Sequence, residues 1–180
     1  MIHLVLGGAR SGKSRFAESL VIRRLAESQN GAALECLYFA TAEALDSEMS
    51  ERIAQHQSQR NHHAITWRTI ESPLALSAAL TANAKVNSIV LVDCLTLWLT
   101  NHLLQSSSDW QTTKTEFLQA INALPAEVIL VSNEVGCGIV PMGEISRRFV
   151  DEAGWLHQDI AAIADKVTLV TAGLPLSLKG

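Results

Sequence analysis

Short apolar runs alternate along the chain with longer segments in which apolar residues recur every three or four positions. The short runs are rich in aliphatic and β-branched residues, which is typical of strands buried on both faces of a sheet. The predicted strands span residues 2–6, 34–40, 66–70, 88–93, 127–132 and 166–171, of which 66–70 is the weakest. The predicted helices span residues 13–28, 43–59, 73–84, 95–104, 110–124 and 143–164.

This alternation predicts the α/β class, with a mostly parallel sheet and helices on both of its faces. The chain has 180 residues, of which 48% are hydrophobic and 18% are charged. A chain of this length buries about 70% of its unfolded surface and needs no disulfide to hold its core. We therefore expect residues 1–180 to form a single domain.

Charge and cysteine content restrict the classes of partner. The 14 Lys and Arg against 18 Asp and Glu give a net charge of −4, which favours neither nucleic acid nor anionic lipid as a partner. Cys36, Cys94 and Cys137 lie far apart, which argues against a disulfide framework or a zinc site. No apolar stretch approaches the roughly 18 residues of a membrane helix. We expect a cytoplasmic protein with no membrane insertion.

A glycine-rich turn follows the first predicted strand and opens the first predicted helix. It fits the phosphate-binding pattern GxxxxGKS with Gly7, Gly8, Ala9, Arg10, Ser11, Gly12, Lys13 and Ser14. The glycines let consecutive N–H groups face a phosphate, and the helix adds the positive end of its dipole. We expect Lys13 to bridge the outer phosphates and Ser14 to offer its hydroxyl to Mg²⁺, with Arg10 as an extra cation. The alternative is a plain turn between strand and helix.

Polar residues follow two of the predicted buried strands. Asp93 ends the run 88–93, where it either holds Mg²⁺ beside the phosphate loop or caps the next helix. Asn133 and Glu134 follow the run 127–132, where they either line a nucleotide crevice or cap a turn. The segment 135–141 is glycine-punctuated and hydrophobic, and it is a candidate cover for a bound substrate.

One predicted helix carries a histidine between two arginines. Glu48, Arg52, His56 and Arg60 are spaced four residues apart and so share a helix face. The two cations favour the neutral imidazole, which leaves a ring nitrogen free to attack phosphorus. The alternative is a solvated face on which Glu48 and Arg52 pair and His56 has no role. His62 and His63 are predicted to lie in a loop.

These motifs resemble one known family when taken together and in order. The matching segments are Gly7-Gly-Ala-Arg-Ser-Gly-Lys-Ser14, Ala40-Thr41-Ala42, Arg52-Ile-Ala-Gln-His56, Thr69-Ile-Glu71, Val92-Asp-Cys-Leu-Thr96 and Asn133-Glu-Val-Gly-Cys-Gly-Ile-Val-Pro141. The family is the bifunctional adenosylcobinamide kinase and adenosylcobinamide-phosphate guanylyltransferase. The phosphate loop alone is shared by many families, whereas the histidine segment combined with the Asn-Glu-Val-Gly segment is specific.

The resemblance implies a two-step transferase with a P-loop, RecA-like fold. A nucleoside triphosphate, GTP or ATP, phosphorylates adenosylcobinamide, and GTP then donates GMP to that phosphate. The products of the second step are adenosylcobinamide-GDP and pyrophosphate. The family carries GMP on a histidine, which matches His56 here, and its members are trimers. Mg²⁺ is the implied cofactor.

The same resemblance assigns further nucleotide contacts, position by position. Beyond the loop from Gly7 to Ser14, they are Ala40, Thr41, Ala42, Gln57, Ser58, Gln59, Arg60, Glu71 and Asp93. Three departures stand out: Asn61 follows Arg60 where proline is usual, Gln57 stands where a basic residue is common, and His157 replaces an asparagine. Two other functions remain open from sequence alone: a P-loop kinase of another small molecule, and a nucleotide-gated binding module without transfer chemistry.

Overall fold

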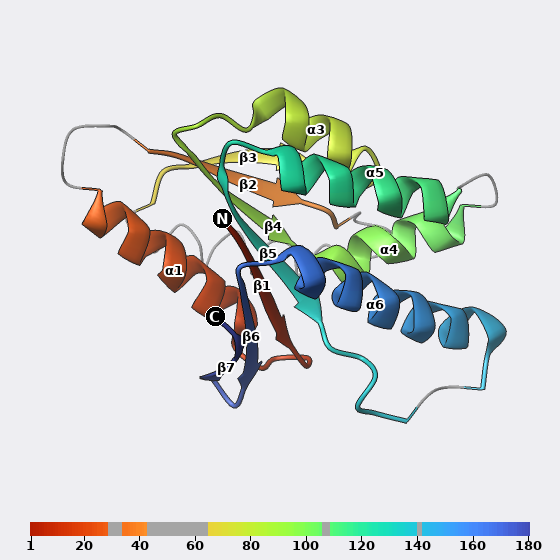
Figure 1. Ribbon diagram of the computed structural model, residues 1–180. Helices are drawn as coiled ribbons and strands as arrows, with labels where there is room; N and C mark the ends of the chain where they lie inside the picture. Colours follow the sequence, from red (N-terminus) through yellow and green to blue (C-terminus); the bar gives the residue numbers. More distant parts are fainter. Residues whose placement is uncertain (29–33, 43–64, 106–108, 140–141) are drawn as a thin grey trace.

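The computed structural model describes residues 1–28, 34–42, 65–105, 109–139 and 142–180. Its centre is a seven-stranded sheet in the order β3-β2-β4-β5-β1-β6-β7, parallel except for the antiparallel pair β6 and β7 (Figure 1). The strands are β1 (Ile2–Gly7), β2 (Glu35–Ala40), β3 (Trp67–Glu71), β4 (Ser88–Asp93), β5 (Glu127–Asn133), β6 (Lys166–Thr171) and β7 (Leu174–Lys179). The predicted α/β class with a mostly parallel sheet is confirmed.

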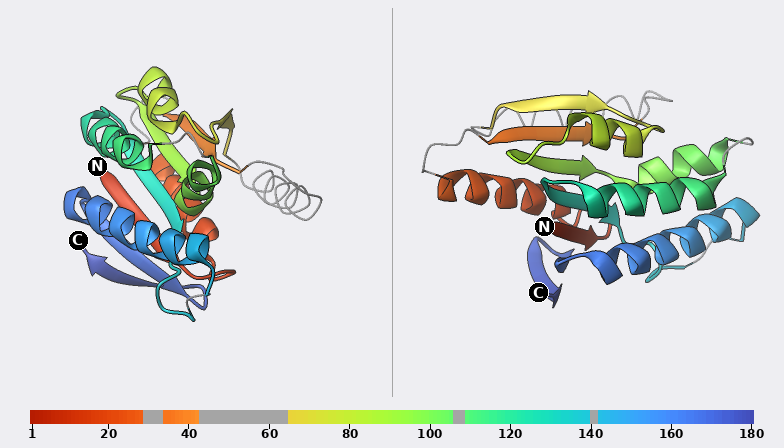
Figure 2. Two further views of the ribbon diagram at one scale, coloured as in Figure 1. Left: turned by 90° about the vertical axis from the view of Figure 1, so that its right-hand side faces the viewer. Right: turned by 45° about the horizontal axis from the view of Figure 1, so that its top comes forward.

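Helices cover both faces of this sheet (Figure 2). They are α1 (Lys13–Glu27), α3 (Leu76–Asn83), α4 (Leu95–Leu104), α5 (Trp110–Ala123) and α6 (Glu144–Ile163). Alternate strand residues point to opposite sides, so Leu130 packs in the core under α3 to α6 while Val131 packs under α1. Because both faces are covered, the central strands are continuous apolar runs, as the sequence pattern predicts.

The sequence pattern misses one strand, β7. Its leucines alternate with Pro175, Ser177 and Lys179, and every residue of the strand is exposed. It forms because Ala172 and Gly173 adopt positive φ angles of 51° and 78° and turn the chain back along β6. The predicted helix 73–84 is also too long, since α3 begins only at Leu76. The predicted helix 43–59 lies outside the described residues.

The parallel order brings the carboxyl ends of the strands to one edge of the sheet. The register pairs Gly7 of β1 with Asn133 of β5, and it pairs Ala40 of β2 with both Glu71 of β3 and Asp93 of β4. Ligands of parallel α/β sheets bind at this carboxyl edge. The sequence motifs on these strands therefore meet where a nucleotide is expected.

Two of the four tryptophans lie in the core. Trp98 and Trp110 are at most 2% exposed and pack edge to face, with ring centroids 5.1 Å apart. Trp155 is instead 51% exposed. All three cysteines are free, and Cys137 alone is exposed. No described helix combines the length and the apolar character that crossing a bilayer requires.

Candidate functional site

The phosphate loop is a tight turn between β1 and α1, and two of its glycines are required by its geometry. A Cβ on Gly7 would lie 2.4 Å from the Ser11 hydroxyl oxygen and 2.6 Å from the Val170 carbonyl oxygen. Gly12 has a φ of 93°, a conformation that strongly favours glycine. The turn closes through the Ser11 N–H, which donates to the Gly8 carbonyl at 3.3 Å. The glycine positions of the sequence motif thus have the backbone roles that the motif predicts.

The turn between β6 and β7 contacts the phosphate loop and helps to hold it in place. The Gly173 N–H donates to the Ser11 carbonyl at 2.8 Å, and a Cβ on Gly12 would lie 3.2 Å from the Gly173 Cα. Sequence reasoning did not find this contact, because it joins residues more than 160 positions apart. The Ala172-Gly173 pair, a turn signal after a strand, was the available clue.

The first turn of α1 is arranged to receive an anion. The helix begins at Lys13 with no described side chain capping its N–H groups and no acid in its first turn. The Lys13 ammonium donates to the Gly8 carbonyl at 3.1 Å, so it lies over the loop. The Ser11 hydroxyl is buried, and within the described part of the chain it has no hydrogen-bond partner. Free N–H groups, a cation and an unpaired hydroxyl together suit a phosphate chain.

Asp93 ends β4 and does not cap the helix after it. Helix α4 begins after Cys94, and no described side chain caps its N-terminus. The Asp93 carboxylate accepts instead from the Tyr38 hydroxyl at 3.4 Å. The peptide bond between Asp93 and Cys94 is cis. Of the two alternatives for Asp93, capping is therefore wrong, and a role in holding a metal ion stays a prediction.

The neighbouring Cys94 is buried and is a poor nucleophile. Burial, together with the Asp93 charge, raises the pKa of its thiol to about 11 against smaller opposing effects from Thr96, Leu97 and Lys13. Its backbone is held by Thr41 at the end of β2. The Thr41 hydroxyl accepts from the Cys94 N–H at 2.8 Å and donates to the Cys94 carbonyl at 2.7 Å.

The Ala40-Thr41-Ala42 segment is thereby fixed beside Asp93. Thr41 is fully buried, and its carbonyl accepts from the Asn101 amide at 2.9 Å. Because both hydrogen-bonding capacities of its hydroxyl are used within the fold, Thr41 offers a ligand no free side-chain group. Ala40 and Ala42 are half-buried at the same edge.

Asn133 and Glu134, at the end of β5, form hydrogen bonds to two different elements. The Asn133 amide donates to the Thr96 hydroxyl of α4 at 2.9 Å, and the Glu134 N–H donates to the Gly7 carbonyl at 3.0 Å. The Glu134 carboxylate accepts from the N–H groups of Gly136 and Cys137 at 2.7 Å and 3.2 Å. Burial acts to raise the pKa of Glu134, but these hydrogen bonds outweigh it, and the pKa lies below its ordinary value. Turn capping is therefore the role the structure shows for Glu134.

His157 of α6 is a polar group at this edge that sequence reasoning left unexplained. One ring nitrogen, Nε2, lies 2.7 Å from the hydroxyl oxygen of Ser132, a fully buried residue near the end of β5. Burial lowers the pKa of His157 to about 4, although the Glu134 charge opposes the shift. The imidazole is therefore neutral at physiological pH. It forms one hydrogen bond with the Ser132 hydroxyl, and the imidazole tautomer decides which of the two atoms donates. The departure from asparagine at this position was the only signal in the sequence.

Glu71 lies at the same edge but far from the phosphate loop. It is exposed at the end of β3, four strands away from β1, and strand spacing places these two strands about 19 Å apart. Asp93 on β4 lies two strands from β1, about 10 Å away. The structure thus brings Asp93 near the loop, and it does not bring Glu71 there. His56, Gln57, Ser58, Gln59 and Arg60 lie outside the described residues.

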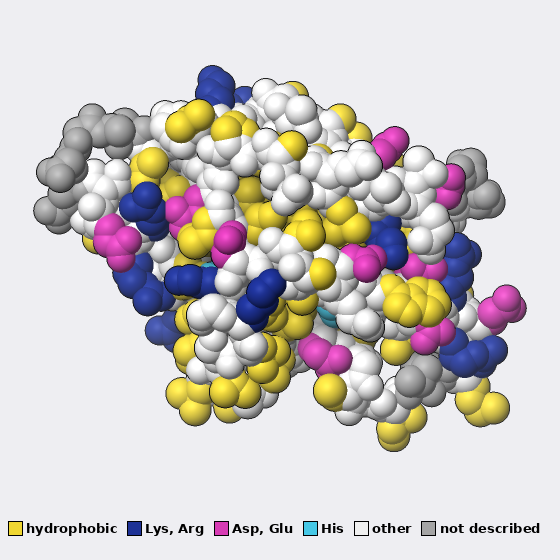
Figure 3. All heavy atoms as spheres, in the orientation of Figure 1, with side chains coloured by type: hydrophobic (Ala, Val, Ile, Leu, Met, Phe, Trp, Pro, Cys, Tyr) yellow, Lys and Arg dark blue, Asp and Glu magenta, His cyan; other side chains and the backbone are white. Residues whose placement is uncertain are grey.

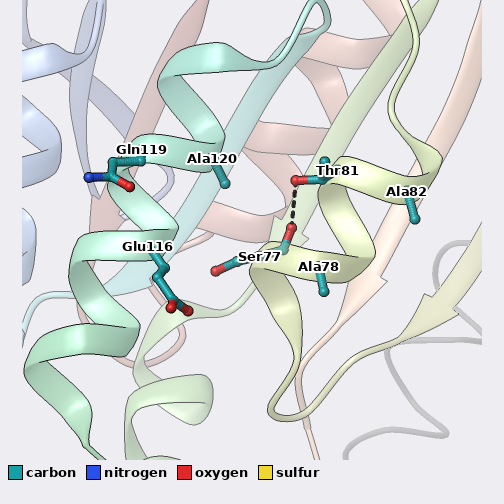
Figure 4. Close-up of a pocket in the computed structure, with 7 residues that line it drawn as sticks. All are labelled: Ser77, Ala78, Thr81, Ala82, Glu116, Gln119 and Ala120. Atoms are coloured by element: carbon teal, nitrogen blue, oxygen red, sulfur yellow. Dashed lines mark hydrogen bonds between the residues drawn. The ribbon is translucent and has the colours of Figure 1, made fainter.

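One surface hollow lies away from this edge, between α3 and α5 (Figure 4). Its walls are mostly small side chains such as Ser77, Ala78 and Ala120, with Glu116 as the one charged group that lines it. The Thr81 hydroxyl donates to the Ser77 carbonyl at 2.9 Å, so it is hydrogen-bonded within its own helix. This hollow holds no set of groups able to bind a phosphate.

Comparison with known proteins identifies the family. A family model described as cobinamide kinase / cobinamide phosphate guanyltransferase matches residues 3–178. The chain belongs to this family. A bifunctional adenosylcobalamin biosynthesis protein of Pseudomonas aeruginosa is 52% identical over 181 residues, covering 100% of this chain and 98% of that protein. Similar proteins of Escherichia coli and Salmonella typhimurium are 39% and 38% identical, each covering 99% of this chain and 100% of theirs.

Membership of the cobinamide kinase / cobinamide phosphate guanyltransferase family confirms the resemblance drawn from the motifs. It makes the chain an enzyme of two transferase types, kinase and nucleotidyltransferase. It also agrees with the P-loop fold, in which one glycine-rich turn after β1 opens α1. This fold favours a phosphate loop over a plain turn for residues 7–14, whose binding role stays a prediction.

Phosphate transfer of this kind implies a bound Mg²⁺, and the described residues include side chains that could supply its ligands. No three His, Cys, Asp or Glu side chains gather into a metal site in the part of the chain that the structure describes. A P-loop needs no such cluster, because phosphate oxygens and water complete the shell of Mg²⁺ around one hydroxyl and one acid. Ser14 at the start of α1 and Asp93 at the end of β4 are oxygen donors of that kind at the same edge.

Proposed function

We propose that this chain first phosphorylates adenosylcobinamide and then transfers GMP from GTP to the new phosphate. The observation that carries the proposal is the family match over nearly the whole chain, together with a phosphate loop whose glycines, lysine and helix N-terminus are in place. Both reactions move a phosphorus group of a nucleoside triphosphate, so both depend on the same cradle.

In the kinase step, the aminopropanol hydroxyl of adenosylcobinamide attacks the γ-phosphorus of GTP or ATP. An O–P bond forms, the bond from the bridging oxygen to the γ-phosphorus breaks, and the nucleoside diphosphate leaves. The hydroxyl loses its proton to a base that we do not assign. Lys13 and the N–H groups of residues 8–14 hold the outer phosphates and stabilise their charge as the bond breaks.

In the guanylyl step, a ring nitrogen of His56 attacks the α-phosphorus of GTP. The N–P bond forms, pyrophosphate leaves, and GMP remains on the protein. A phosphate oxygen of adenosylcobinamide phosphate then attacks the same phosphorus, the N–P bond breaks, and adenosylcobinamide-GDP forms. A covalent intermediate of this kind replaces one difficult displacement with two easier ones. Support for His56 comes from the Arg52-Ile-Ala-Gln-His56 motif.

We assign the remaining contacts in the same way. Mg²⁺, held by Ser14 and Asp93, supplies charge neutralisation on the phosphate oxygens when it is bound. The guanylyl group is contacted by Ala40, Thr41, Ala42, Gln57, Ser58, Gln59 and Arg60, with Glu71 and Asp93 as further nucleotide contacts. Since the hydroxyl, N–H and carbonyl of Thr41 are all hydrogen-bonded within the fold, Thr41 contributes by holding Ala40 and Ala42 in place. A cytoplasmic homotrimer without nucleic-acid partners completes the proposal.

Intact-mass measurement after incubation with GTP and Mg²⁺ tests the proposal. We expect wild type to gain the mass of one GMP in an acid-labile bond and His56→Ala to gain none. His62→Ala and His63→Ala are the matched controls and keep the adduct. Lys13→Ala also fails to form it, because the triphosphate is not held. Wild type that binds GTP without forming an adduct would overturn the covalent step and favour a kinase of another molecule.

A further inference from the structure

An apolar groove of about 370 Å³ lies next to the phosphate loop. It is bounded by the end of α4, the segment after β5 and the start of α6, on the right-hand side of Figure 1. Its apolar walls come mainly from Leu103, Leu104, Val135, Ile139, Ile145 and Phe149. Of these, Ile139 is 99% exposed, and Leu104 and Ile145 are 59% and 51% exposed.

Two hydrogen bonds connect the groove to the nucleotide end of the sheet. The Glu134 N–H donates to the Gly7 carbonyl, and the next residue, Val135, lines the groove. The Asn133 amide donates to the Thr96 hydroxyl, and one turn later on α4 Thr100 lines the groove. The Val135 end of the groove therefore lies close to Gly7, at the start of the phosphate loop.

The side chains that line the groove indicate which kind of ligand it binds. Among the described residues that line the groove, the only polar side chains are the hydroxyls of Thr100 and Ser146, so these residues offer no carboxylate or amide to a guanine base. Apolar walls bind apolar surface, and the cobinamide acceptor is the reactant that has it, at the methyl-bearing edge of its corrin ring. The groove is also open and too small for a whole corrin, which suits one edge of a large ring.

We infer that this groove binds the edge of the corrin ring of the cobinamide acceptor and so directs the acceptor toward the phosphate loop. The inference rests on the proposed function, because the identity of the acceptor comes from that function. Leu104 and Ile139 supply exposed apolar contact area, and the 134–139 segment forms one wall.

The double variant Leu104→Ser with Ile139→Ser tests this assignment without disturbing the core, because both side chains are exposed. We expect the KM for adenosylcobinamide phosphate to rise about tenfold, as apolar contacts to the acceptor are lost. GMP adduct formation from GTP alone involves no acceptor and reports separately on the nucleotide half. Val86→Ser is the matched control, since Val86 is 82% exposed at the opposite edge of the sheet.

Cys137 gives a second readout that does not depend on turnover. It is the one exposed cysteine and lies in the segment that forms the groove wall, so a maleimide followed by intact mass measures its accessibility. Saturating cobinamide is expected to slow labelling several-fold in wild type and not in the double variant. Unchanged KM and unchanged labelling in a protein that forms the adduct would overturn the inference. So would a double variant that alters only the oligomeric state, because the groove would then be a contact between copies. Absence of the adduct in wild type would instead overturn the proposed function.

Discussion

At the scale of single residues, the two glycines that begin the phosphate loop differ in what they tolerate. A Cβ on Gly7 would collide with the Ser11 hydroxyl and the Val170 carbonyl, whereas a Cβ on Gly8 would meet nothing within 4 Å. We expect Gly7→Ala to lower the free energy of unfolding by about 2–4 kcal/mol, since a neighbouring backbone atom must move. Gly8→Ala should unfold like wild type. Urea unfolding of both variants checks this, and equal midpoints would contradict it.

Two histidines, the buried His3 and the half-buried His157, predict a loss of stability in mild acid. Burial lowers the pKa of His157 to about 4, and burial with the charges of Lys166 and Arg23 lowers the pKa of His3 to about 4. Their ordinary value is 6.5, so the unfolded chain binds more protons between pH 6.5 and pH 4. The contribution to stability is therefore present above pH 6.5 and is lost as the pH falls toward 4.

Replacing one of these histidines should reduce that pH dependence. For His157→Asn, the fall in the free energy of unfolding from pH 7 to pH 5 is expected to be smaller by about 1–2 kcal/mol. Gln158→Asn, one residue along the same helix, is the control and keeps the wild-type dependence. Denaturant titrations at both pH values measure the difference. An unchanged dependence in His157→Asn would show that this imidazole is not held neutral.

At the scale of elements, a single threonine joins β2 to the start of α4. The Thr41 hydroxyl satisfies both the N–H and the carbonyl of Cys94, and all of these groups are buried. We expect Thr41→Val to cost about 1–3 kcal/mol, because it leaves the buried Cys94 N–H without a partner, while the Cys94 carbonyl still accepts from the Trp98 N–H. Thr81→Val is the matched control, since the Thr81 hydroxyl bonds only its own exposed helix at Ser77. Thermal unfolding compares the two, and equal losses would count against the bridge.

The strands that are buried on both faces of the sheet could be predicted from the sequence, whereas the exposed edge strand could not. The runs that became β1, β4 and β5 are apolar throughout because helices cover both faces. Strand β7 escaped prediction because every residue in it is exposed, and because the turn before it is held by a bond from Gly173 to Ser11, which lies far away in the chain. The phosphate loop was predictable because its chemistry is local. The bond between His157 and Ser132 was not, because tertiary packing brings those residues together.

At the scale of the whole molecule, the unpaired edge of the sheet predicts self-association. Leu174, Leu176 and Leu178 of β7 are 70%, 58% and 55% exposed, and hydrophobic side chains gather over this part of the surface (Figure 3). An exposed apolar edge strand favours pairing with another chain. We expect wild type to sediment as a homo-oligomer, a trimer by family resemblance, and Leu176→Lys to sediment as a smaller species. Val86→Lys, also at an exposed apolar residue, should leave the assembly intact. A monomeric wild type would contradict this expectation.

The most direct test of the account is a chase of the GMP-loaded protein. Protein incubated with GTP and Mg²⁺ is freed of nucleotide, mixed with adenosylcobinamide phosphate, and followed by intact mass over a single turnover. We expect the adduct to disappear while one equivalent of adenosylcobinamide-GDP forms, at a rate no slower than steady-state turnover. An adduct that survives the acceptor, or product that forms only when free GTP is present, would contradict it.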